Sequence, residues 1–388
     1  MASGAMAALR LPPVRLSGAV EGLRSELRSF LAEELAEGSY VPRCDAWLGA
    51  HSPEFSRKVA ARGWLGMTWP ERYGGHERSA LERYTVTEEL LVAGAPVAAH
   101  WIADRQTGPS LLRYGTEEQR RRFLPRIARG ECYFAIGMSE PDSGSDLASV
   151  RTRATRVDGG FLVNGTKIWT SHAHRSHFMF ILCRTAALGD DRHAGLSQLI
   201  LDLAAPGVTI RGIPLLTGAH HFNEVVMADV FVGDDLILGQ LGEGWRQVTS
   251  ELAFERSGPE RFLSTFPLLV ELVRVLGPDP GERASEAIGR LVAQLWALRG
   301  LSLAVAAAID AGEAPAVQAA LVKDLGTRLE RDIAEVARLV APERSRFPAD
   351  SRLFELLTEA LLMIPGFTLR GGTTEILRGI VARSLEAR

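Results

Sequence analysis

Apolar residues recur at helical spacing through the first third of the chain. A helix is predicted over residues 20–35, because five apolar side chains fall on one of its faces: Leu23, Leu27, Phe30, Leu31 and Leu35. The stretches 79–95 and 117–130 have the same character, and Gly130 fits the end of the second. A connector rich in turn-forming residues lies at 62–75. The pattern predicts a helical region up to about residue 130.

The pattern changes to short β-rich runs between Glu131 and Gly242. These runs are separated by turn residues and cover 161–169, 178–184, 198–203 and 224–232. Asn164-Gly165 is a strong hairpin signal, so we expect a tight turn there. The middle of the chain is therefore predicted to be a compact β domain, a barrel or a sandwich.

Helical patterns return from Gly244 to the end of the chain. Two long stretches, 283–310 and about 315–340, are apolar enough to pack inside a bundle, and a last helix is expected after Gly371-Gly372. The segment GPDPGE at 277–282 marks a break between helices. The order predicts an α+β protein with three domains: 1–130 helical, 131–242 β-barrel and 243–388 helical bundle. That order by itself indicates no function.

Composition and charge exclude several classes of protein. The 388 residues carry a net charge of -3, whereas nucleic-acid-binding proteins are typically strongly basic. We read no apolar run of the roughly 18 to 20 residues that a membrane span needs, and the N-terminal residues do not resemble a signal peptide. The chain has three cysteines, Cys44, Cys132 and Cys183, far apart and in no metal-ligand spacing. This usage indicates a reducing, cytoplasmic compartment and no structural metal.

Two loops of the β region are candidates for ligand binding. The segment IGMSEPDSGSD at 136–146 holds three serines among turn formers. It is either a surface loop or a loop whose amides and hydroxyls meet a phosphate or a polar ring edge. In NGTKIWTS, at 164–171, Trp169 precedes two hydroxyl residues. This tryptophan belongs to the core or stacks on a flat cofactor.

Three further clusters have an ordinary and a functional interpretation. His172, His174 and His177 are spaced like metal ligands, but a solvated loop is the better interpretation. Adjacent Glu255 and Arg256 on a helix usually form a solvated face. In the elbow GGTTE at 371–375, threonine and glutamate suit a helix start. Two glycines exceed what capping requires, and they favour close approach by a ligand.

Taken together, these segments resemble the acyl-CoA dehydrogenase family of flavoproteins from about residue 20 to the end. The resemblance is carried by five motifs in order: WLGMTWPERYGG at 64–75, SEPDSGSD at 139–146, NGTKIWTS at 164–171, FNEVVMADV at 222–230 with GEGW at 242–245, and GGTTEILRGIVAR at 371–383. It implies an N-terminal helical domain, a middle β-barrel and a C-terminal four-helix bundle. It also implies an oxidoreductase of fatty acid and lipid metabolism.

The resemblance implies FAD as the cofactor, bound between the β domain and the bundle. The expected reaction removes the α-proton of an acyl-CoA with a carboxylate and passes the β-hydrogen as hydride to flavin N5, giving a trans-2-enoyl-CoA. Positions that match contacts to the flavin ring are Met138, Ser139, Trp169 and Ser171. Ser145 matches a position near the pyrophosphate and the CoA, and Thr373 and Glu375 match contacts to the adenosine half.

The elbow departs from the commonest family pattern, in which a catalytic glutamate stands where this chain has Gly371. Isovaleryl- and long-chain-type members carry the base on the first helix of the bundle, one residue before an arginine. This chain has Glu255 followed by Arg256 at that place. The resemblance therefore implies Glu255 as the base and Arg256 as a substrate-site residue.

A second departure bears on partners. The family's Arg-x-x-Phe-Gly segment, which reaches the FAD of a neighbouring subunit, is missing, since Phe-Gly occurs nowhere in the chain. The Gln-x-x-Gly-Gly segment is not visible either. The chain is thus expected to be a working dehydrogenase, in a homo-oligomer or with a homologous subunit, that passes electrons to electron-transfer flavoprotein. Two alternatives stay open: a partner subunit with little activity alone, and an oxygen-using acyl-CoA oxidase-like enzyme.

Overall fold

The chain packs as two units, and neither is continuous in sequence. A computed structural model describes residues 11–187, 190–342 and 351–386, without the side chains of 251–255 and 385–386. The first unit combines Met1–Ala50, Ser79–Pro96 and Ala253–Arg388, and the second combines His51–Arg78 and Val97–Leu252. The predicted three-domain division at residues 130 and 242 differs from this grouping and stays a prediction.

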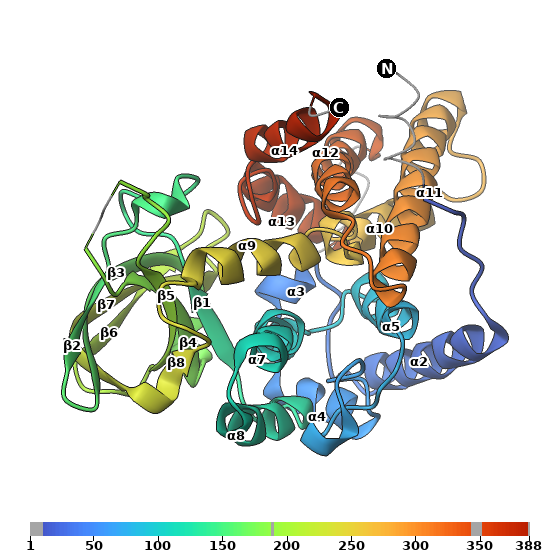
Figure 1. Cartoon of the computed structure of the whole chain (residues 1–388). Helices are drawn as coiled ribbons and strands as arrows, with labels where there is room; N and C mark the ends of the chain where they lie inside the picture. The colour runs from blue at the N-terminus through green and yellow to red at the C-terminus, as the bar shows by residue number, and fades with distance from the viewer. Residues whose placement is uncertain (1–10, 188–189, 343–350, 387–388) are drawn as a thin grey trace. The chain divides into compact units, whose positions relative to one another are not determined.

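The first unit is helical. Its helices are α2 (Gly18–Ala36), α3 (Ala46–Gly49), α5 (Ala80–Val92), α10 (Phe266–Leu276), α11 (Glu282–Asp310), α12 (Ala316–Val340), α13 (Arg352–Phe367) and α14 (Thr374–Glu386), with a 3-10 turn η6 (Pro259–Arg261) (Figure 1). The predicted helices at 20–35, 79–95, 283–310 and 315–340 are confirmed, as are the break at 277–282 and the helix after the double glycine.

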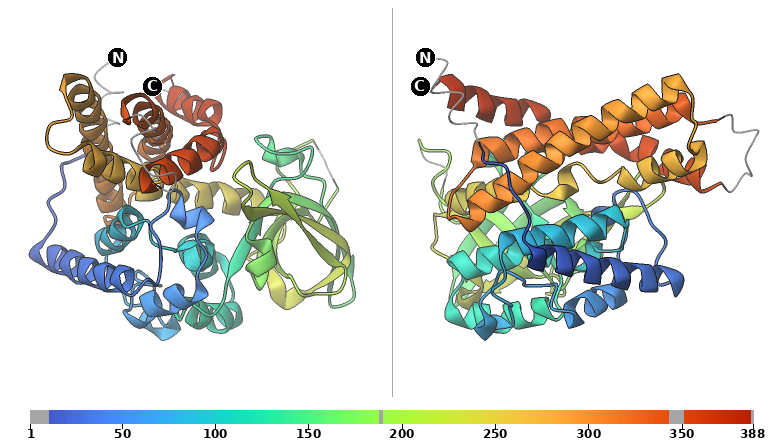
Figure 2. Two further views of the ribbon diagram at one scale, coloured as in Figure 1. Left: turned by 180° about the vertical axis from the view of Figure 1, so that it is seen from behind. Right: turned by 90° about the vertical axis from the view of Figure 1, so that its right-hand side faces the viewer.

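Helices α11 and α12 run side by side along most of their length (Figure 2). The buried residues of α12 recur every three or four positions, which is the face that packing requires: Ala319, Val322, Gly326, Leu329, Ile333 and Ala337. A buried carboxylate ties three helices together, because Glu88 of α5 accepts from Arg24 of α2 at 3.2 Å and from Arg299 of α11 at 2.7 Å. Apolar packing and paired buried charge together hold this unit.

By length and composition, α11 is apolar enough to cross a membrane, contrary to our expectation that no run would be. A third of its most apolar window, 33%, is buried inside the protein. Core helices of globular domains have the same composition.

The second unit combines short helices with one sheet. Its helical elements are α4 (Pro53–Ala61), η1 (Glu71–Tyr73), α6 (Ala98–Ile102), η2 (Ala103–Thr107), α7 (Gly108–Tyr114), α8 (Glu117–Ala128), η3 (Leu147–Ser149), η4 (Ala173–Arg175), η5 (Asp234–Leu236) and most of α9 (Gly244–Glu255). Its strands are β1 (Phe134–Gly137), β2 (Arg153–Val157), β3 (Gly160–Ser171), β4 (Phe178–Arg184), β5 (Leu196–Asp202), β6 (Val208–Pro214), β7 (His220–Gly233) and β8 (Ile237–Leu238).

The sheet is curled but not closed, so the predicted barrel is wrong in this respect. The strand order is β6-β7-β3-β2-β4-β5-β8, with β1 pairing in parallel with β4 (Figure 1). Strands β6 and β8 stand at the two ends of that order, and within the described residues no ladder joins them. Between β2 and β4 a single residue pair, Arg153 with Arg184, holds the ladder.

The hairpin predicted at Asn164-Gly165 is also wrong. Both residues lie inside the continuous strand β3, at a register shift opposite β7. The Asn164 side chain donates to the Asp229 carboxylate at 2.8 Å and accepts from the Asp229 amide at 3.0 Å. The turn is instead made by Asp158-Gly159, between β2 and β3. Asp-Gly is as strong a hairpin signal as Asn-Gly, so the local sequence is compatible with a turn at either position. Pairing between the strands determines that the turn forms at Asp158-Gly159.

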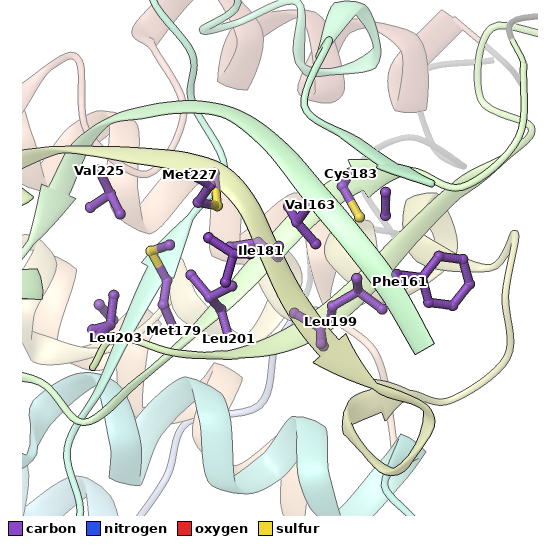
Figure 3. Packing of buried hydrophobic residues seen from close by; sticks show 14 of the residues in the cluster. Phe161, Val163, Met179, Ile181, Cys183, Leu199, Leu201, Leu203, Val225 and Met227 are labelled. Atoms are coloured by element: carbon purple, nitrogen blue, oxygen red, sulfur yellow. The ribbon is translucent and has the colours of Figure 1, made fainter. Parts of the chain in front are cut away.

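The core of the sheet comes from alternate residues of several strands. Met179, Ile181, Leu199, Leu201 and Val225 gather on one face and are fully buried (Figure 3). The opposite face of β4 joins an aromatic cluster with α8: Phe123, Phe134, Phe178 and Phe180. The three cysteines are buried and form no disulfide, and burial raises the pKa of the Cys183 thiol to about 12.

Removing one aromatic ring from this cluster should lower stability strongly. Phe180 has no exposed surface, so Phe180→Ala is expected to cost about 3–5 kcal/mol in the free energy of unfolding. Phe231→Ala is the matched control, because that side chain is 54% exposed. Urea unfolding followed by circular dichroism measures both. Equal losses in the two variants would contradict the burial shown here.

Candidate functional site

In the second unit, the structure brings the two predicted ring-contact segments together. Met138 and Ser139 follow the end of β1, while Trp169 and Ser171 lie at the end of β3. The amide of Ile168 donates to the carbonyl of Ser139 at 2.9 Å, which joins the segments directly. Met138 also packs against Val150 and Leu182. Four of the expected cofactor residues thus lie in two adjoining segments of the sheet domain.

A buried ion pair fixes these two segments to each other. Lys167 has no exposed surface, and its ammonium donates to the Glu140 carboxylate at 2.8 Å and to the Met138 carbonyl at 3.1 Å. Glu140 also accepts from the amides of Arg151 and Thr152. Burial alone would raise the pKa of Glu140, but Lys167 and these donors hold it below its ordinary value. The loop after β1 is therefore anchored to β3 by charge as well as by backbone bonds.

Trp169 stands at a bulge in β3. The register with β7 shifts between Lys167 and Thr170, and Trp169 has a left-handed φ of 59°. Its side chain is 54% exposed, and the edge of its ring contacts Phe222 at 5.8 Å between centroids. A bulky residue adopts this backbone conformation only where the surroundings impose it, and bulges commonly redirect a side chain beside a site. The indole is thereby presented outward.

Three serine hydroxyls are available in the same region. Among the described residues, no hydrogen bond engages the side chains of Ser139, Ser145 or Ser171. Ser145 is exposed, in a loop that closes on itself because Ser143 donates to the Asp146 carbonyl at 2.8 Å. Free hydroxyls beside an exposed indole fit a polar aromatic ligand such as a flavin ring.

The elbow residues lie in the first unit, before α14. Gly371 and Gly372 have left-handed φ values of 65° and 96°, which only glycine adopts without strain. Thr373 caps the helix, since its hydroxyl accepts from the Ile376 amide at 3.4 Å. Glu375 is exposed in the first turn, where its own amide and the Thr373 hydroxyl lower its pKa. The predicted helix cap is confirmed by this bond.

The two glycines have a reason within the chain itself. A Cβ on Gly371 would lie 3.1 Å from the Arg261 guanidinium and 3.2 Å from Cε of Lys323. A Cβ on Gly372 would lie 3.2 Å from the Arg256 guanidinium. Their backbone conformation and these close side chains require glycine before any ligand is considered. The two glycines are therefore no evidence by themselves that a ligand approaches the elbow.

Glu255, the expected base, is the last residue of α9, and its side chain lies outside the described residues. The residue that follows, Arg256, is described in full. Arg256 is 8% exposed, so the interpretation of this charged pair as a solvated face is wrong for the arginine. Its Nε donates to the Gly371 carbonyl at 3.3 Å. The end of α9 therefore lies against the elbow.

Sequence reasoning missed the charged residues that hold both segments. These are Lys167 and Glu140 beside the sheet loop, and Arg261 and Lys323 beside the elbow. A signal existed for Lys167, because it stands in a β-rich run where an apolar residue is expected. Composition held another signal: the chain has three lysines among 44 basic residues, and two of the three are those named here.

The histidines of the second unit do not form the expected solvated loop. His172 is 4% exposed and lies 5.2 Å from His51 and 5.8 Å from His221 between ring centroids, while His177 is exposed. His174 stacks on His220 at 4.0 Å, and both rings contact the Asn223 side-chain oxygen. In the part of the chain that the structure describes, no cluster of three His, Cys, Asp or Glu could hold a metal.

Comparison with known proteins identifies the family. Three family models match in order: the acyl-CoA dehydrogenase N-terminal domain over 19–131, its middle domain over 135–230 and its C-terminal domain over 282–386. The acyl-CoA dehydrogenase IpdE1 of Mycobacterium tuberculosis is 35% identical over 94% of this chain and 96% of its own length. The chain therefore belongs to the acyl-CoA dehydrogenase family.

Two solved structures agree. One, described as the Tcur3481-Tcur3483 steroid ACAD, has a TM-score of 0.84 and 28% identity, covering 96% of this chain and 98% of that chain. The other, the ChsE4-ChsE5 complex from Mycobacterium tuberculosis, has a TM-score of 0.82 and 28% identity, covering 97% and 99%. The fold is that of the acyl-CoA dehydrogenases, and the chain is an enzyme of that kind.

Two histidines with lowered pKa values, the half-buried His51 and the buried His100, should make the second unit sensitive to acid. Burial, and for His51 the neighbouring His172 and Arg175, lowers the pKa of His51 and of His100 from 6.5 to about 3. Since the unfolded chain takes up these protons first, the stabilisation is complete above pH 6.5 and is lost as the pH falls toward 3. His51→Gln should flatten this dependence in urea unfolding between pH 7.5 and 5. Exposed His76→Gln is the control, and an unchanged slope in His51→Gln would count against the assignment.

Proposed function

We propose that this protein is an FAD-dependent acyl-CoA dehydrogenase that forms a trans-2-enoyl-CoA, with Glu255 as the catalytic base. The observation that carries the proposal is the bond from Arg256 to the Gly371 carbonyl. Residue 371 is where the commoner family pattern has its base, and it is glycine here. Because Arg256 contacts Gly371, the backbone of the preceding residue, Glu255, lies close to the position that the commoner base occupies, although it belongs to a different helix.

The cofactor fits the residues present. Exposed Trp169 and the free hydroxyls of Ser139 and Ser171, with Met138 beside them, suit the flavin ring. Ser145 would meet the pyrophosphate and the CoA, and Thr373 and Glu375 the adenosine half. FAD, when bound, accepts the hydride from the β-carbon of the substrate.

The chain's own residues then have distinct tasks. The Glu255 carboxylate takes the α-proton, which is weakly acidic because the thioester stabilises the enolate only in part. Arg256, held by the elbow, binds at the substrate site and fixes the end of α9. Closure of the site around the thioester excludes water and strengthens the base. Proton and hydride leave from opposite faces of the substrate, so the carboxylate must be held on the face opposite the flavin.

The class of acyl group is best sought among bulky thioesters. A solved relative that is 28% identical over 96% of this chain is described as a steroid ACAD. A steroid-bearing acyl-CoA therefore deserves the first place in a screen, with straight-chain and branched acyl-CoAs beside it. Electron-transfer flavoprotein is the proposed acceptor, in the cytoplasm.

The chain is also proposed to work with a second chain of the same fold. Large apolar side chains are exposed along the bundle, with Val292 at 47%, Trp296 at 76% and Leu339 at 54%. Exposed apolar surface of this kind marks an association face. The missing Phe-Gly segment points the same way, because another chain must then complete the FAD site. A homologous chain is favoured by the two relatives whose descriptions name two different chains.

The central test is Glu255→Gln, which keeps the size of the side chain and removes the base. Turnover of an accepted acyl-CoA with an artificial electron acceptor should fall by about 10²- to 10⁴-fold, while flavin content stays at the parent value. Glu243→Gln, at the other end of α9, is the matched control and should keep the parent rate. A near-parent rate in Glu255→Gln would make the partner-subunit interpretation the better one.

Association is tested at the bundle. Trp296→Ser should weaken self-association or association with the homologous chain by at least about 10-fold, since a tryptophan that becomes buried at an interface is often a hot spot. Leu216→Ser, 81% exposed in the second unit, is the control. Sedimentation measures both, with and without the homologue. A parent protein that is a monomer under every condition would contradict the assembly.

A further inference from the structure

The chain contains three lysines, Lys58, Lys167 and Lys323, against 41 arginines, which follows from 44 basic residues less three. Two of these lysines, Lys167 and Lys323, have no exposed surface. Burying an ammonium costs several kcal/mol unless oxygen atoms surround it. The chain uses arginine at almost every basic position but has lysine at these two buried ones. We infer that these two positions require a compact cation.

Both buried lysines donate to a backbone carbonyl of a segment that the proposed function assigns to the cofactor. Lys167 donates to Met138 at 3.1 Å, beside Ser139. Lys323 donates to Gly372 at 2.9 Å, directly before Thr373. The two bonds lie in different units and on different elements, β3 and α12. The same arrangement therefore appears twice, once in each unit.

Space explains why arginine would not serve at residue 323. A Cβ added to Gly371 would lie 3.2 Å from Cε of Lys323 and 3.1 Å from the Arg261 guanidinium, so both cations lie close to the elbow. Beside Arg261, a compact ammonium on a slender stem needs less room than a second planar guanidinium. The methylene stem of Lys323 thus lies beside Gly371, and its ammonium donates to the carbonyl of the next residue, Gly372.

We propose that Lys167 and Lys323 are positioning residues of the cofactor site. Lys167 sets the loop that meets the flavin ring, and Lys323 sets the elbow that meets the adenosine half. The proposal rests on the proposed function for the identity of the cofactor, and on the structure for the two bonds. Neither lysine touches the reacting atoms, so each acts through the backbone that it holds.

The two lysines should give different signatures when each is changed to methionine, which keeps the length and removes the charge. Lys323→Met should weaken FAD binding about 10-fold or more, as expected for a lost charged hydrogen bond, with an unshifted flavin absorption spectrum. Lys167→Met, made together with Glu140→Gln so that no carboxylate stays buried and unpaired, should shift the absorption spectrum of bound flavin. Titration of apoprotein with FAD, followed by absorbance and fluorescence, reads both.

Two controls separate positioning from general loss of stability. Val322→Ala removes buried volume next to Lys323 and should lower the melting temperature while FAD affinity stays within about twofold of the parent. Lys58→Met makes the same chemical change at the remaining lysine and should alter neither property of the flavin. FAD affinity of Lys323→Met equal to the parent, or a loss no larger than that of Val322→Ala, would overturn the proposal for the elbow. An unshifted spectrum in the Lys167 variant would overturn it for the loop.

Hydrogen exchange of the apoprotein distinguishes this proposal from the proposed function. Faster amide exchange is expected in 366–379 for Lys323→Met and in 136–141 for the Lys167 variant, relative to Val322→Ala. If the parent binds no FAD, the proposed function fails and the exchange data alone decide whether the lysines hold these segments. Unchanged exchange in both segments refutes the positioning role whatever the cofactor.

Discussion

A buried ammonium must find oxygen partners, and in each of the two units this requirement fixes one segment that is proposed to contact the cofactor. Lys167 joins the loop after β1 to β3 through Met138 and Glu140. Lys323 joins the elbow before α14 to the long helix α12 through Gly372. The partners are backbone carbonyls, whose position follows the fold and not a side-chain rotamer. Segments rich in glycine and serine thereby gain fixed positions, and the charge-assisted hydrogen bonds offset part of the conformational entropy that is lost.

Around the elbow, the same charges account for the absence of a glutamate at residue 371. Arg261 and Lys323 lie within about 3 Å of the place where its Cβ would be, and the backbone is left-handed there. A carboxylate at that position would pair with these cations and become a weaker base. The base proposed in its place, Glu255, precedes Arg256 and so requires no side chain at residue 371. The glycine at this position is thus a consequence of the packing around the elbow.

In the second unit, the arrangement around Trp169 depends on an interruption of regular structure. The bulge in β3 turns Trp169 outward and keeps Lys167 inward, although only one residue separates them. A continuous ladder would alternate the two faces, so it would place residues 167 and 169 on the same side. The local break therefore provides an exposed indole and a buried ion pair on adjacent parts of one strand. Phe222 and Asn223 on β7 support the strand from the other side.

Much of the fold could be predicted from the sequence alone. Helical spacing located α2, α5, α8, α11 and α12, and the five motifs led to the family, because apolar periodicity and turn residues are local properties. Thr373 could be read as a helix cap for the same reason. The residues expected at the flavin were named from resemblance, and the structure places Met138, Ser139, Trp169 and Ser171 in two adjoining segments.

Tertiary structure decided what depends on partners distant in sequence. Only cross-strand pairing could place the turn at Asp158-Gly159 and leave Asn164-Gly165 inside β3, or leave the sheet unclosed. Only packing could bury His172 among other histidines and seat Arg256 on the Gly371 carbonyl, 115 residues away in sequence. The same holds for the two lysines, whose residue type was visible in the sequence. Their role follows from burial, since a cation excluded from water must bind whatever oxygen the fold brings to it.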